Sequence, residues 1–362
     1  MKILYDNEIF GLQSVGGASN YFANLITRLQ ESGNQIIFPH LYTNNIYIKD
    51  INCTNFPQAK FFLSKYYYRL INNKFSKKII YSGQYDIFHH TYYDTYFLDK
   101  FKKSSRLVIT IHDMVHERYP ELNKFGKIIT NNKKKLVARA DKIIVISQKT
   151  KDDLCKFFSV DEKKISIIYH GRNFDEISIK HPPLNYLPDE YLLFVGTRSG
   201  YKNFDWMVKN LAKTLLSRNI TLVCIGSPFT SQELGLINYL GIPRLVKHCL
   251  VKDTVTLQNI YANAQIFIYP SLYEGFGMPI LEAYAAKVPV LLTNASCFPE
   301  IAGSGAMYFQ PHDPDDFSNK VNLILDSKDL SLKLTNAGLS RLKDFSWAKC
   351  VTETAKAYQE IM

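Results

Sequence analysis

Short, continuously apolar runs recur along this chain, and they constrain its fold more than any other feature of the sequence. Three of them lie in the first half, at residues 106–112 (RLVITIH), 142–147 (KIIVIS) and 164–169 (KISIIY). Residues 220–226 (ITLVCIG) repeat the form in the second half. Stretches of helical character separate these runs. Strands that are apolar on both faces belong to parallel sheets covered by helices on both sides, so the sequence predicts an α/β fold.

A proline-rich segment divides the predicted elements into two groups. Residues 181–188 (HPPLNYLP) hold three prolines in eight positions, which is typical of an interdomain linker. The remaining predicted elements are strands at residues 2–5, 35–38, 191–196, 265–269 and 289–293 and helices over residues 18–32 and 203–217. The simplest architecture is two doubly wound, Rossmann-like domains, residues 1–180 and 189–345, facing across a cleft. Ligands bind beyond the carboxyl ends of parallel strands, so we expect a site in that cleft.

The balance of charge differs between the two halves. The 362 residues carry a net charge of +11, and residues 1–180 hold all of the excess, with 28 Lys and Arg against 17 Asp and Glu. Such asymmetry indicates an anionic partner for the first half. Residues 60–78 interleave basic with aromatic and aliphatic side chains, and residues 133–135 (KKK) add further charge. This composition suits an interfacial helix on anionic lipid.

The basic aromatic segment at residues 60–78 is also compatible with two different roles. It could be a basic helix packed on its own domain, or it could bind RNA. No RNA-binding motif accompanies it, so we expect no nucleic-acid partner. The membrane hypothesis implies a lipid-linked or lipopolysaccharide-type acceptor and a protein that is peripheral on the inner face of the cell membrane.

Composition excludes several other classes of protein. No run approaches the ~20 apolar residues that span a bilayer. The N-terminal residues 1–6 (MKILYD) lack the long apolar run of a signal peptide, which indicates a cytoplasmic protein. The six cysteines are scattered and form no CxxC, so we expect reduced thiols rather than a zinc site or a disulfide framework.

Residues 269–283 (YPSLYEGFGMPILEA) combine a predicted strand end, a glycine-rich turn and a helix start. Gly275 and Gly277 let the backbone turn sharply and approach a ligand closely. Pro279 suits the first turn of a helix, where its missing N–H is not needed. Backbone N–H groups near residues 276–278 would then point at a ligand. A helix N-terminus of this kind favours an anion such as a diphosphate.

Two carboxylates flank this turn. Glu274 comes just before the glycines, and Glu282 lies about one turn inside the helix. Carboxylates repel phosphate but accept hydrogen bonds from hydroxyl groups. Sugar hydroxyls for Glu274 and ribose hydroxyls for Glu282 are therefore the natural partners. Without a ligand, the same string is a strand–turn–helix unit with two solvated glutamates.

The string from Glu274 to Glu282 (EGFGMPILE) resembles the E-x7-E signature of the family 4 retaining glycosyltransferases, which have the GT-B fold. The segments that share this resemblance are residues 16–18 (GGA), 110–113 (TIHD), 146–150 (ISQKT), 299–303 (PEIAG) and 345–347 (FSW). Among family members, the chain is similar to the bacterial enzymes that build O-antigen and lipopolysaccharide, including mannosyltransferases. The GT-B fold further implies that a last helix, at about residues 346–362, packs back on the first domain.

The resemblance assigns roles to individual residues. It implies that His112, which ends a central strand, and Glu274 act at the transferred sugar, and both are predicted as catalytic. The predicted donor-binding residues are Gly16, Gly17, Arg198, Lys202, Phe276, Gly277, Met278 and Glu282, and the weaker candidates are Asp113 and Glu300. In the family a basic pair contacts the diphosphate. Lys202 matches its lysine, whereas Thr197 stands where the arginine commonly does and Arg198 comes one residue later.

The resemblance implies transfer of a sugar from a nucleoside diphosphate to an acceptor hydroxyl, with retention of the anomeric configuration. Overall likeness favours GDP-mannose or a related GDP-sugar, with a UDP-sugar as the alternative. Residues 313–316 (DPDD) have the spacing of a metal-binding carboxylate pair but are typical of a helix start, so we expect no metal and no other cofactor. Two other functions stay open: a GT-B-fold nucleotide-sugar epimerase and a non-catalytic membrane-associated binding protein.

Overall fold

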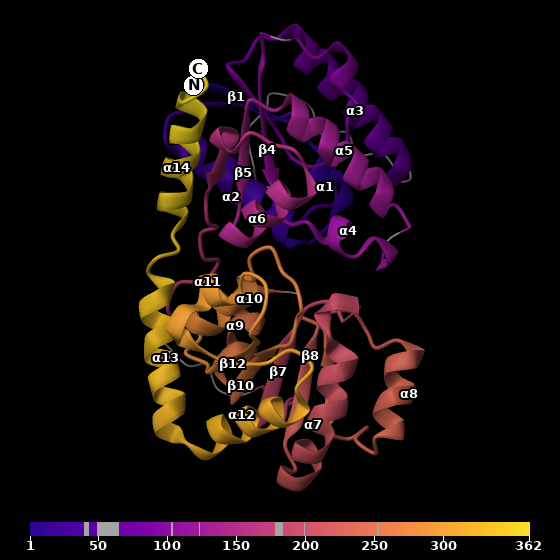
Figure 1. Ribbon diagram of the computed structural model, residues 1–362, viewed down its shortest axis with the longest axis vertical. Helices are drawn as coiled ribbons and strands as arrows, with labels where there is room; N and C mark the ends of the chain where they lie inside the picture. Colours follow the sequence, from indigo (N-terminus) through magenta and orange to yellow (C-terminus); the bar gives the residue numbers. More distant parts are fainter. Residues whose placement is uncertain are drawn as a thin grey trace. The chain divides into compact units, whose positions relative to one another are not determined.

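Two parallel β-sheets organise the chain, one in each of two separately packed units. Unit 1 comprises Met1–Gly171 and Ser346–Met362, and unit 2 comprises Arg172–Phe345. The structure is a computed structural model (Figure 1). It describes residues 1–39, 43–48, 65–102, 104–122, 124–177, 184–198, 200–251 and 253–362, with side chains from residue 69 onward in the helix that starts at residue 65.

Unit 1 is built on a sheet whose strands all run parallel. In the described part of this unit the order is β2-β1-β3-β4-β5-β6. These strands are β1 Lys2–Tyr5, β2 Gln35–Ile37, β3 Ile87–His90, β4 Arg106–Ile111, β5 Lys142–Val145 and β6 Ile165–Ile167. The strand order reverses between β1 and β3, which makes this a doubly wound sheet with its switch point there.

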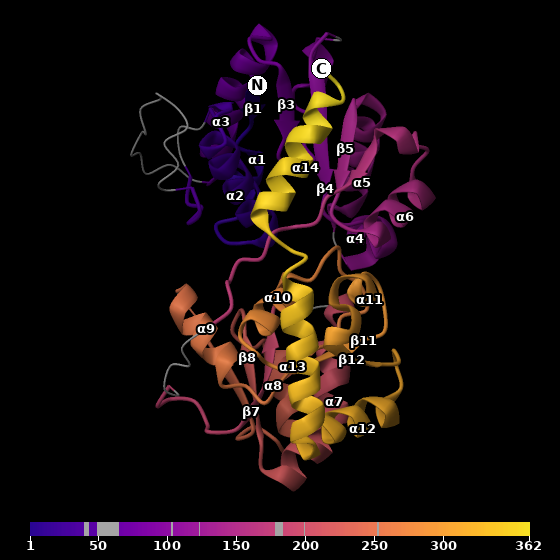
Figure 2. The ribbon, with the colours of Figure 1, turned by 90° about the vertical axis from the view of Figure 1, so that its left-hand side faces the viewer.

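Helices cover both faces of this sheet. They are α1 Glu8–Leu12, α2 Gly17–Glu31, α3 Lys65–Ser82, α4 Val115–Arg118, α5 Gly126–Arg139, α6 Gln148–Phe157 and α14 Trp347–Gln359, with short 3-10 turns η1 Leu98–Lys100, η2 Pro120–Leu122 and η3 Glu162–Lys164. Residues of α2 and α14 share one apolar cluster with Ile3 and Ile144. Residues of α3, α5 and α6 share another with Leu4 and Ile143 (Figure 2). Alternate residues of one strand thus face opposite helical layers.

Unit 2 repeats this plan with a different strand order. Its described strands follow the order β12-β11-β10-β7-β8-β9, again all parallel. The strands are β7 Tyr191–Val195, β8 Thr221–Ile225, β9 Val246–Cys249, β10 Ile266–Tyr269, β11 Val290–Thr293 and β12 Ala306–Phe309. Here the order reverses between β7 and β10, so the switch point lies between the loops that follow these two strands.

Helices also cover both faces of the second sheet. They are α7 Phe204–Arg218, α8 Ser231–Tyr239, α9 Thr254–Ala262, α10 Met278–Ala285, α11 Phe298–Ala302, α12 Pro314–Asp326 and α13 Lys328–Leu342, with 3-10 turns η4 Gly200–Lys202 and η5 Gly303–Gly305. Ile266 and Ile268 of β10 join an apolar cluster with α7 and α12. Between them, Phe267 faces the other way and packs edge-on against Tyr261 of α9. The predicted α/β fold with two doubly wound sheets is confirmed.

The division between the units differs from the predicted domain boundary. The sequence predicted residues 1–180 as the first domain, but unit 1 ends at Gly171. The residues that follow bond within unit 2, where the Ile177 N–H donates to the Ala285 carbonyl at 2.9 Å. Helix α14 belongs to unit 1 and contacts α2. Residues 181–183 of the predicted linker lie outside the described residues.

The basic aromatic segment at residues 60–78 is only partly described. Residues 60–64 lie outside the described residues, and the rest belongs to α3. On this helix Asn72 and Ser76 are buried, and the Ser76 hydroxyl donates to the side-chain oxygen Oδ1 of Asn7 at 3.2 Å. Leu70 and Ile71 are exposed. One side of the helix therefore packs on its own unit while another faces solvent.

Two further expectations concern helices and thiols. Among the described residues, no helix combines the length and the apolar character that a membrane crossing needs. The described cysteines, which are Cys155, Cys224, Cys249, Cys297 and Cys350, are free thiols, and Cys53 lies outside the described residues. Asp313 accepts a hydrogen bond from the Asp316 N–H at 2.9 Å and caps α12, which confirms the helix start predicted for that segment.

Candidate active site

The turn that carries the E-x7-E string follows β10 and leads into α10. Gly277 is the N-cap of this helix and has φ +96°, a left-handed conformation that side chains rarely adopt. A Cβ at this position would lie 2.9 Å from Cδ1 of Ile280. The helix begins at Met278 with Pro279 in its first turn, as predicted. Its first N–H groups have no acceptor within the helix, which suits the end of a helix to an anionic ligand.

Residues that follow β11 hold this turn in place. The Ser296 hydroxyl accepts from the Glu274 N–H at 3.0 Å and donates to the Glu274 carbonyl at 2.8 Å. The Cys297 thiol donates to the Phe276 carbonyl at 3.3 Å. The backbone on either side of Gly275 is thereby anchored to a neighbouring strand end. Sequence reasoning missed Ser296 and Cys297, because nothing local links them to a turn some twenty residues earlier.

Lys202 and Glu274 meet at the switch point of unit 2. Lys202 follows β7 and Glu274 follows β10, and Nζ lies 2.6 Å from Oε1. Both side chains are 12% exposed, so the ion pair is largely withdrawn from water but still accessible. The ammonium also lies over the rings of Tyr201 and Tyr269. The structure thus brings together two predicted site residues that are 72 positions apart in the sequence.

Glu282 is the more deeply placed of the two signature glutamates. It is buried, and its carboxylate accepts hydrogen bonds from the Tyr261 hydroxyl at 3.0 Å and from the Asn173 amide at 3.3 Å. Burial raises the pKa of this carboxyl, while the two hydrogen bonds oppose the shift. Neither partner was predicted from the sequence. The role of Glu282 at a ribose stays a prediction.

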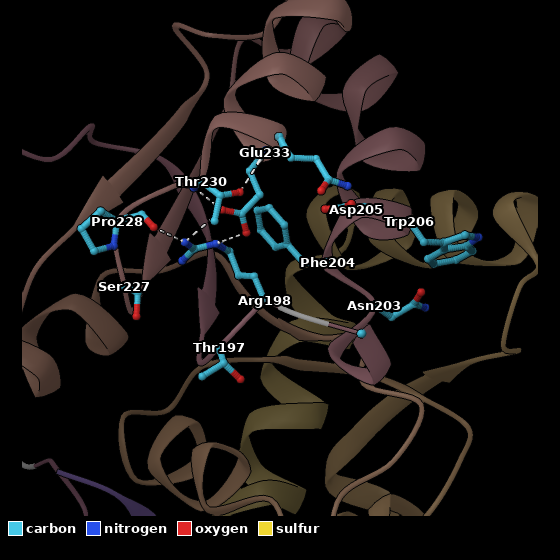
Figure 3. A pocket seen from close by; sticks show the side chains of 12 residues that line it. Thr197, Arg198, Asn203, Phe204, Asp205, Trp206, Ser227, Pro228, Thr230 and Glu233 are labelled. Carbon is cyan, nitrogen blue, oxygen red and sulfur yellow. Dashed lines mark hydrogen bonds and ion pairs between the residues drawn. The ribbon is translucent and has the colours of Figure 1, made fainter. Parts of the chain in front are cut away.

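Arg198 makes contacts that the sequence did not predict. Its Nε donates to Glu233 Oε1 at 2.7 Å, and its Nη2 donates to the Pro228 carbonyl at 2.8 Å (Figure 3). The guanidinium lies near the stacked rings of Phe204 and Phe229, with its Cζ 5.5 and 4.8 Å from their centroids. This buried pair borders a cavity of about 570 Å³ beside the loops that follow β7 and β8. The predicted contact of Arg198 with a diphosphate stays a prediction.

Three weaker or backbone-based candidates lie near the turn. The Phe276 ring is buried and packs edge-on against Phe345, so its side chain serves the core. Met278 is partly exposed at the start of α10. Glu300 lies on α11. Burial is the main cause that raises the pKa of the Cys297 thiol, and the nearby carboxylates of Glu274 and Glu300 raise it further. Both glutamates are therefore close to Cys297.

In unit 1, Gly16 and Gly17 form the start of α2, as predicted. Gly17 has open space where a Cβ would lie, whereas a Cβ at Gly16 would overlap the Gln13 side chain. That side chain already caps the helix, since its Oε1 accepts from the Ser19 N–H at 3.1 Å. The two glycines leave the backbone accessible to a ligand, but the Ser19 N–H in the first turn of the helix already donates to Gln13.

His112 follows β4 and lies in an aromatic surrounding. Its backbone N–H donates to the Tyr93 hydroxyl at 3.0 Å, and its ring packs edge-on against Tyr21 and Phe22. Burial lowers the pKa of this imidazole to about 4, with a further contribution from Lys133. In the described part of the chain the ring Nε2 has no hydrogen-bond partner. A neutral imidazole with a spare nitrogen suits a hydrogen bond to a sugar hydroxyl.

Asp113 has a structural role next to His112. Its Oδ1 accepts from the Val115 N–H at 3.1 Å, which shapes the turn into α4. Lys133 donates to the Asp113 carbonyl oxygen at 2.9 Å and to Glu117 at 3.0 Å. Burial opposes ionisation of Asp113, but Lys133 and the Val115 N–H hold its pKa below the ordinary value. The role of Asp113 at the donor, a weaker candidate from the sequence, stays a prediction.

A buried charged cluster at the switch point of unit 1 was missed from the sequence. His90 Nδ1 lies 2.9 Å from Asp6 Oδ2, and His90 Nε2 lies 3.1 Å from Glu8 Oε2. Burial opposes a charge on the ring, but the two carboxylates outweigh it and raise the pKa of His90 to about 10. Ligand atoms of these three residues lie close enough together for a metal ion. An imidazolium, however, has no lone pair for a metal, and both nitrogens of His90 already face carboxylates.

Comparison with known proteins decides the family. Residues 15–176 match the family model described as Glycosyltransferase Family 4. Residues 175–341 match the model described as Glycosyl transferases group 1. The chain is a family 4 glycosyltransferase. The predicted family is confirmed, and the E-x7-E turn of the family 4 enzyme lies in the part that matches the group 1 model.

Curated relatives of this family 4 enzyme include O-antigen enzymes. The O-antigen chain mannosyltransferase RfbU of Salmonella typhimurium is 29% identical over 239 residues, which is 63% of each chain. The O-antigen chain mannosyltransferase B of Escherichia coli is 27% identical over 278 residues, which is 70% of each chain. The matched region thus spans about two thirds of these relatives.

Solved structures share the fold over nearly the whole chain. Sucrose-phosphate synthase from Thermosynechococcus elongatus superposes with a TM-score of 0.75 at 18% identity, covering 99% of this chain and 98% of that one. HepE of Anabaena, solved in complex with UDP and glucose, also gives 0.75, at 16% identity and 99% coverage of both chains. The family 4 glycosyltransferase therefore has the GT-B fold that was predicted.

Proposed function

We propose that this glycosyltransferase transfers mannose or a related sugar from a GDP-sugar to a membrane-associated glycan acceptor in the synthesis of a bacterial surface polysaccharide. The ion pair of Lys202 and Glu274 at the switch point of unit 2 carries the proposal. It offers a cation for phosphate and a carboxylate for hydroxyls at the place where doubly wound sheets bind ligands. The O-antigen mannosyltransferases among the relatives support the choice of sugar and acceptor.

The proposed reaction retains the anomeric configuration. The acceptor oxygen bonds to the anomeric carbon on the face from which the diphosphate departs, and the leaving phosphate oxygen takes the proton of the acceptor hydroxyl. No protein group needs to gain or lose a proton in this step. The chain then contributes orientation and stabilisation of the charge on the leaving group. We propose that no metal ion takes part, because the Lys202 ammonium supplies positive charge for the diphosphate.

Each site residue has a part in this proposal. Lys202 moves from Glu274 toward the diphosphate, which frees the Glu274 carboxylate to accept from hydroxyls of the transferred sugar. The neutral imidazole of His112 forms a hydrogen bond with a sugar hydroxyl. Glu282, held by Tyr261, takes the ribose hydroxyls.

The proposed acceptor places the enzyme at the cytoplasmic face of the membrane. The excess of positive charge in residues 1–180 supports an anionic surface as partner. The exposed Leu70 and Ile71 on α3, beside the exposed Lys74, give the predicted basic aromatic segment an amphipathic outer side. Nothing in this proposal involves a nucleic acid.

A thermal-shift screen with GDP, UDP, ADP and CMP and their sugars tests the donor. A ligand at 100 times its dissociation constant stabilises the fold by about 2.7 kcal/mol. We expect GDP and GDP-mannose to give the largest shift. NMR of the product formed with a membrane extract as acceptor then checks the anomeric configuration, which should match that of the donor. The proposal would be contradicted if the protein transferred sugar from none of the nucleotide sugars.

A UDP-sugar is the second candidate donor, because HepE was solved with UDP. The same screen separates it from GDP. An epimerase would convert the donor sugar in the absence of any acceptor, and a non-catalytic binding protein would show a shift without turnover. The NMR measurement shows the converted sugar of an epimerase, and the thermal-shift screen together with NMR identifies binding without turnover.

A further inference from the structure

The surface formed by η2 and the start of α5 carries a cluster of exposed apolar side chains. Leu122 is 46% exposed, Phe125 is 66% exposed and Ile128 is 59% exposed, all within seven residues of one another. Single exposed apolar residues are ordinary, but neighbours of this size at such exposure mark an interaction site. The same helix has a separate inner side, where Leu136 and Val137 are buried in the core of unit 1.

Lysines surround these apolar side chains. Lys124, Lys127, Lys134 and Lys135 are exposed, and none of them forms an ion pair within the part of the chain that the structure describes. Lys133 differs, because it is buried and bonded to Glu117. The acidic side chain on the outside of η2 is Glu121. Four positive charges against one therefore leave this surface strongly basic.

A small hollow lies beside the apolar cluster, where α4 and η2 meet α5. Its volume is about 250 Å³, and it is lined by His116, Glu117, Pro120, Lys127, Thr130, Asn131 and Lys134. The Glu117 carboxylate is paired with the buried Lys133 at 3.0 Å, which offsets its negative charge. Helices α4 and α5 lie next to one another in both views of unit 1 (Figures 1 and 2). Two ammonium groups, an imidazole and a hydroxyl around one hollow suit the phosphate of a lipid headgroup.

We propose that this surface, which consists of Leu122, Phe125 and Ile128 with Lys124, Lys127, Lys134 and Lys135, docks on anionic phospholipid. The apolar side chains insert into the interface between headgroups and acyl chains, and the lysines bind headgroup phosphates around them. This combination of apolar tips and unpaired lysines is what such an interface requires. The biological purpose, access to a membrane-bound acceptor, rests on the proposed function, but the docking itself does not.

The proposal places the main membrane contact on η2 and α5 rather than on the segment at residues 60–78. The outer side of α3 offers Leu70 and Ile71, which are 49% and 43% exposed, and both are less exposed than Phe125 and Ile128. Arg69 of α3 is already paired with Asp94 at 2.7 Å. The two surfaces can be separated by matched substitutions.

Flotation of the full chain with vesicles tests the proposal. Vesicles of equimolar phosphatidylglycerol and phosphatidylcholine are compared with pure phosphatidylcholine at low salt, and circular dichroism checks that each variant is folded. We expect the wild type to float only with the anionic vesicles. Phe125→Asp with Ile128→Asp should weaken partitioning at least about 100-fold, since two exposed apolar side chains that insert into the bilayer are lost. Lys127→Gln with Lys134→Gln should weaken it about 30-fold.

Matched controls make the outcomes decisive. Leu323→Asp with Leu332→Asp changes two similarly exposed apolar residues, at 53% and 60%, in unit 2 and should leave flotation unchanged. Wild type that fails to float with anionic vesicles would overturn the proposal. So would loss of flotation with Leu70→Asp and Ile71→Asp but not with the α5 variants. Flotation that follows the α5 surface in a chain without transferase activity would instead refute the proposed function and leave this docking surface standing.

Discussion

The two sheets each reverse their strand order once, and polar side chains gather at both reversals in opposite ways. In unit 1, Asp6, Glu8 and His90 meet between β1 and β3, and their side chains are 0, 2 and 0% exposed. In unit 2, Lys202 and Glu274 meet between β7 and β10 and are each 12% exposed. The first group is a closed network whose charges satisfy one another. The second pair is open to a ligand.

This difference teaches that topology alone does not make a binding site. Both switch points have the geometry in which doubly wound sheets bind ligands. In unit 1 that place is filled by a protonated histidine between two carboxylates, and the Tyr96 hydroxyl donates to Asp6 at 2.9 Å as well. The candidate catalytic residue of this unit, His112, instead follows β4, one strand further along the sheet.

The largest expected effect is on the stability of the closed network. His90→Asn removes the cation and leaves two buried carboxylates facing each other, which should cost about 3–5 kcal/mol of unfolding free energy. Chemical denaturation measures it. His312→Asn is the matched control, because His312 is exposed and has φ +61°, a conformation that Asn tolerates. Unchanged stability in His90→Asn would show that this switch point is not a structural network.

The next effect should fall mainly on activity, with a smaller effect on stability. Glu274→Gln and Lys202→Met should each lower kcat about 100- to 1,000-fold, the cost of removing one preorganised electrostatic group. Their melting temperatures should fall less than that of His90→Asn, because at 12% exposure the remaining charge keeps some access to water. Initial rates of sugar transfer measure the effect. Full activity in either variant would remove the open pair from the mechanism.

These two predictions rest on features that differ in how well the sequence predicts them. The turn from β10 into α10 was predictable, because glycine, proline and apolar periodicity act locally. Strand β3 (IFHH) was missed, since two histidines interrupt its apolar run, and β9 (VKHC) was missed for its alternating polarity. The network around His90 joins β3 to Asp6, 84 positions earlier, a pairing that only the folded sheet creates.

The site residues also divide into those that the sequence predicts and those that it does not. Lys202, Glu274 and His112 were predicted through the resemblance to family 4 glycosyltransferases, whose motifs they match. The residues that hold them were not. Tyr261 reaches Glu282 across 21 positions, and Ser296 reaches Glu274 across 22. An isolated tyrosine or serine carries no local signal of such a contact.

A smaller effect should come from Tyr261→Phe. This change removes the hydroxyl that donates to Glu282 at 3.0 Å and leaves the carboxylate less well held, a loss of about 1–1.5 kcal/mol. We expect the donor KM to rise about 10-fold with kcat nearly unchanged, because the ribose contact acts on ground state and transition state alike. A fall in kcat at constant KM would assign Tyr261 to the chemical step instead.

The smallest expected effect concerns pH. The pKa of His112 is about 4 against an ordinary value of 6.5, so its imidazole stays neutral from pH 8 down to about 5. The ratio of kcat/KM between wild type and His112→Asn should therefore stay constant across that range. The pH dependence of stability is opposite to that of a histidine paired with a carboxylate. The contribution of the neutral His112 to the free energy of unfolding is present above pH 6.5 and is lost as the pH falls toward 4. A ratio that drops with a midpoint near 6.5 would contradict a neutral, buried imidazole.

The most direct test of the open pair is the affinity of the full chain for GDP and for GMP, measured by titration calorimetry in wild type and in Lys202→Met. If the switch point of unit 2 binds the diphosphate through Lys202, the substitution should weaken GDP at least about 10-fold and change GMP much less, since a charge-assisted contact of about 1.5–3 kcal/mol is lost only for GDP. Equal affinity of wild type and Lys202→Met for GDP, or an equal loss of affinity for GDP and GMP, would contradict binding of the diphosphate by Lys202.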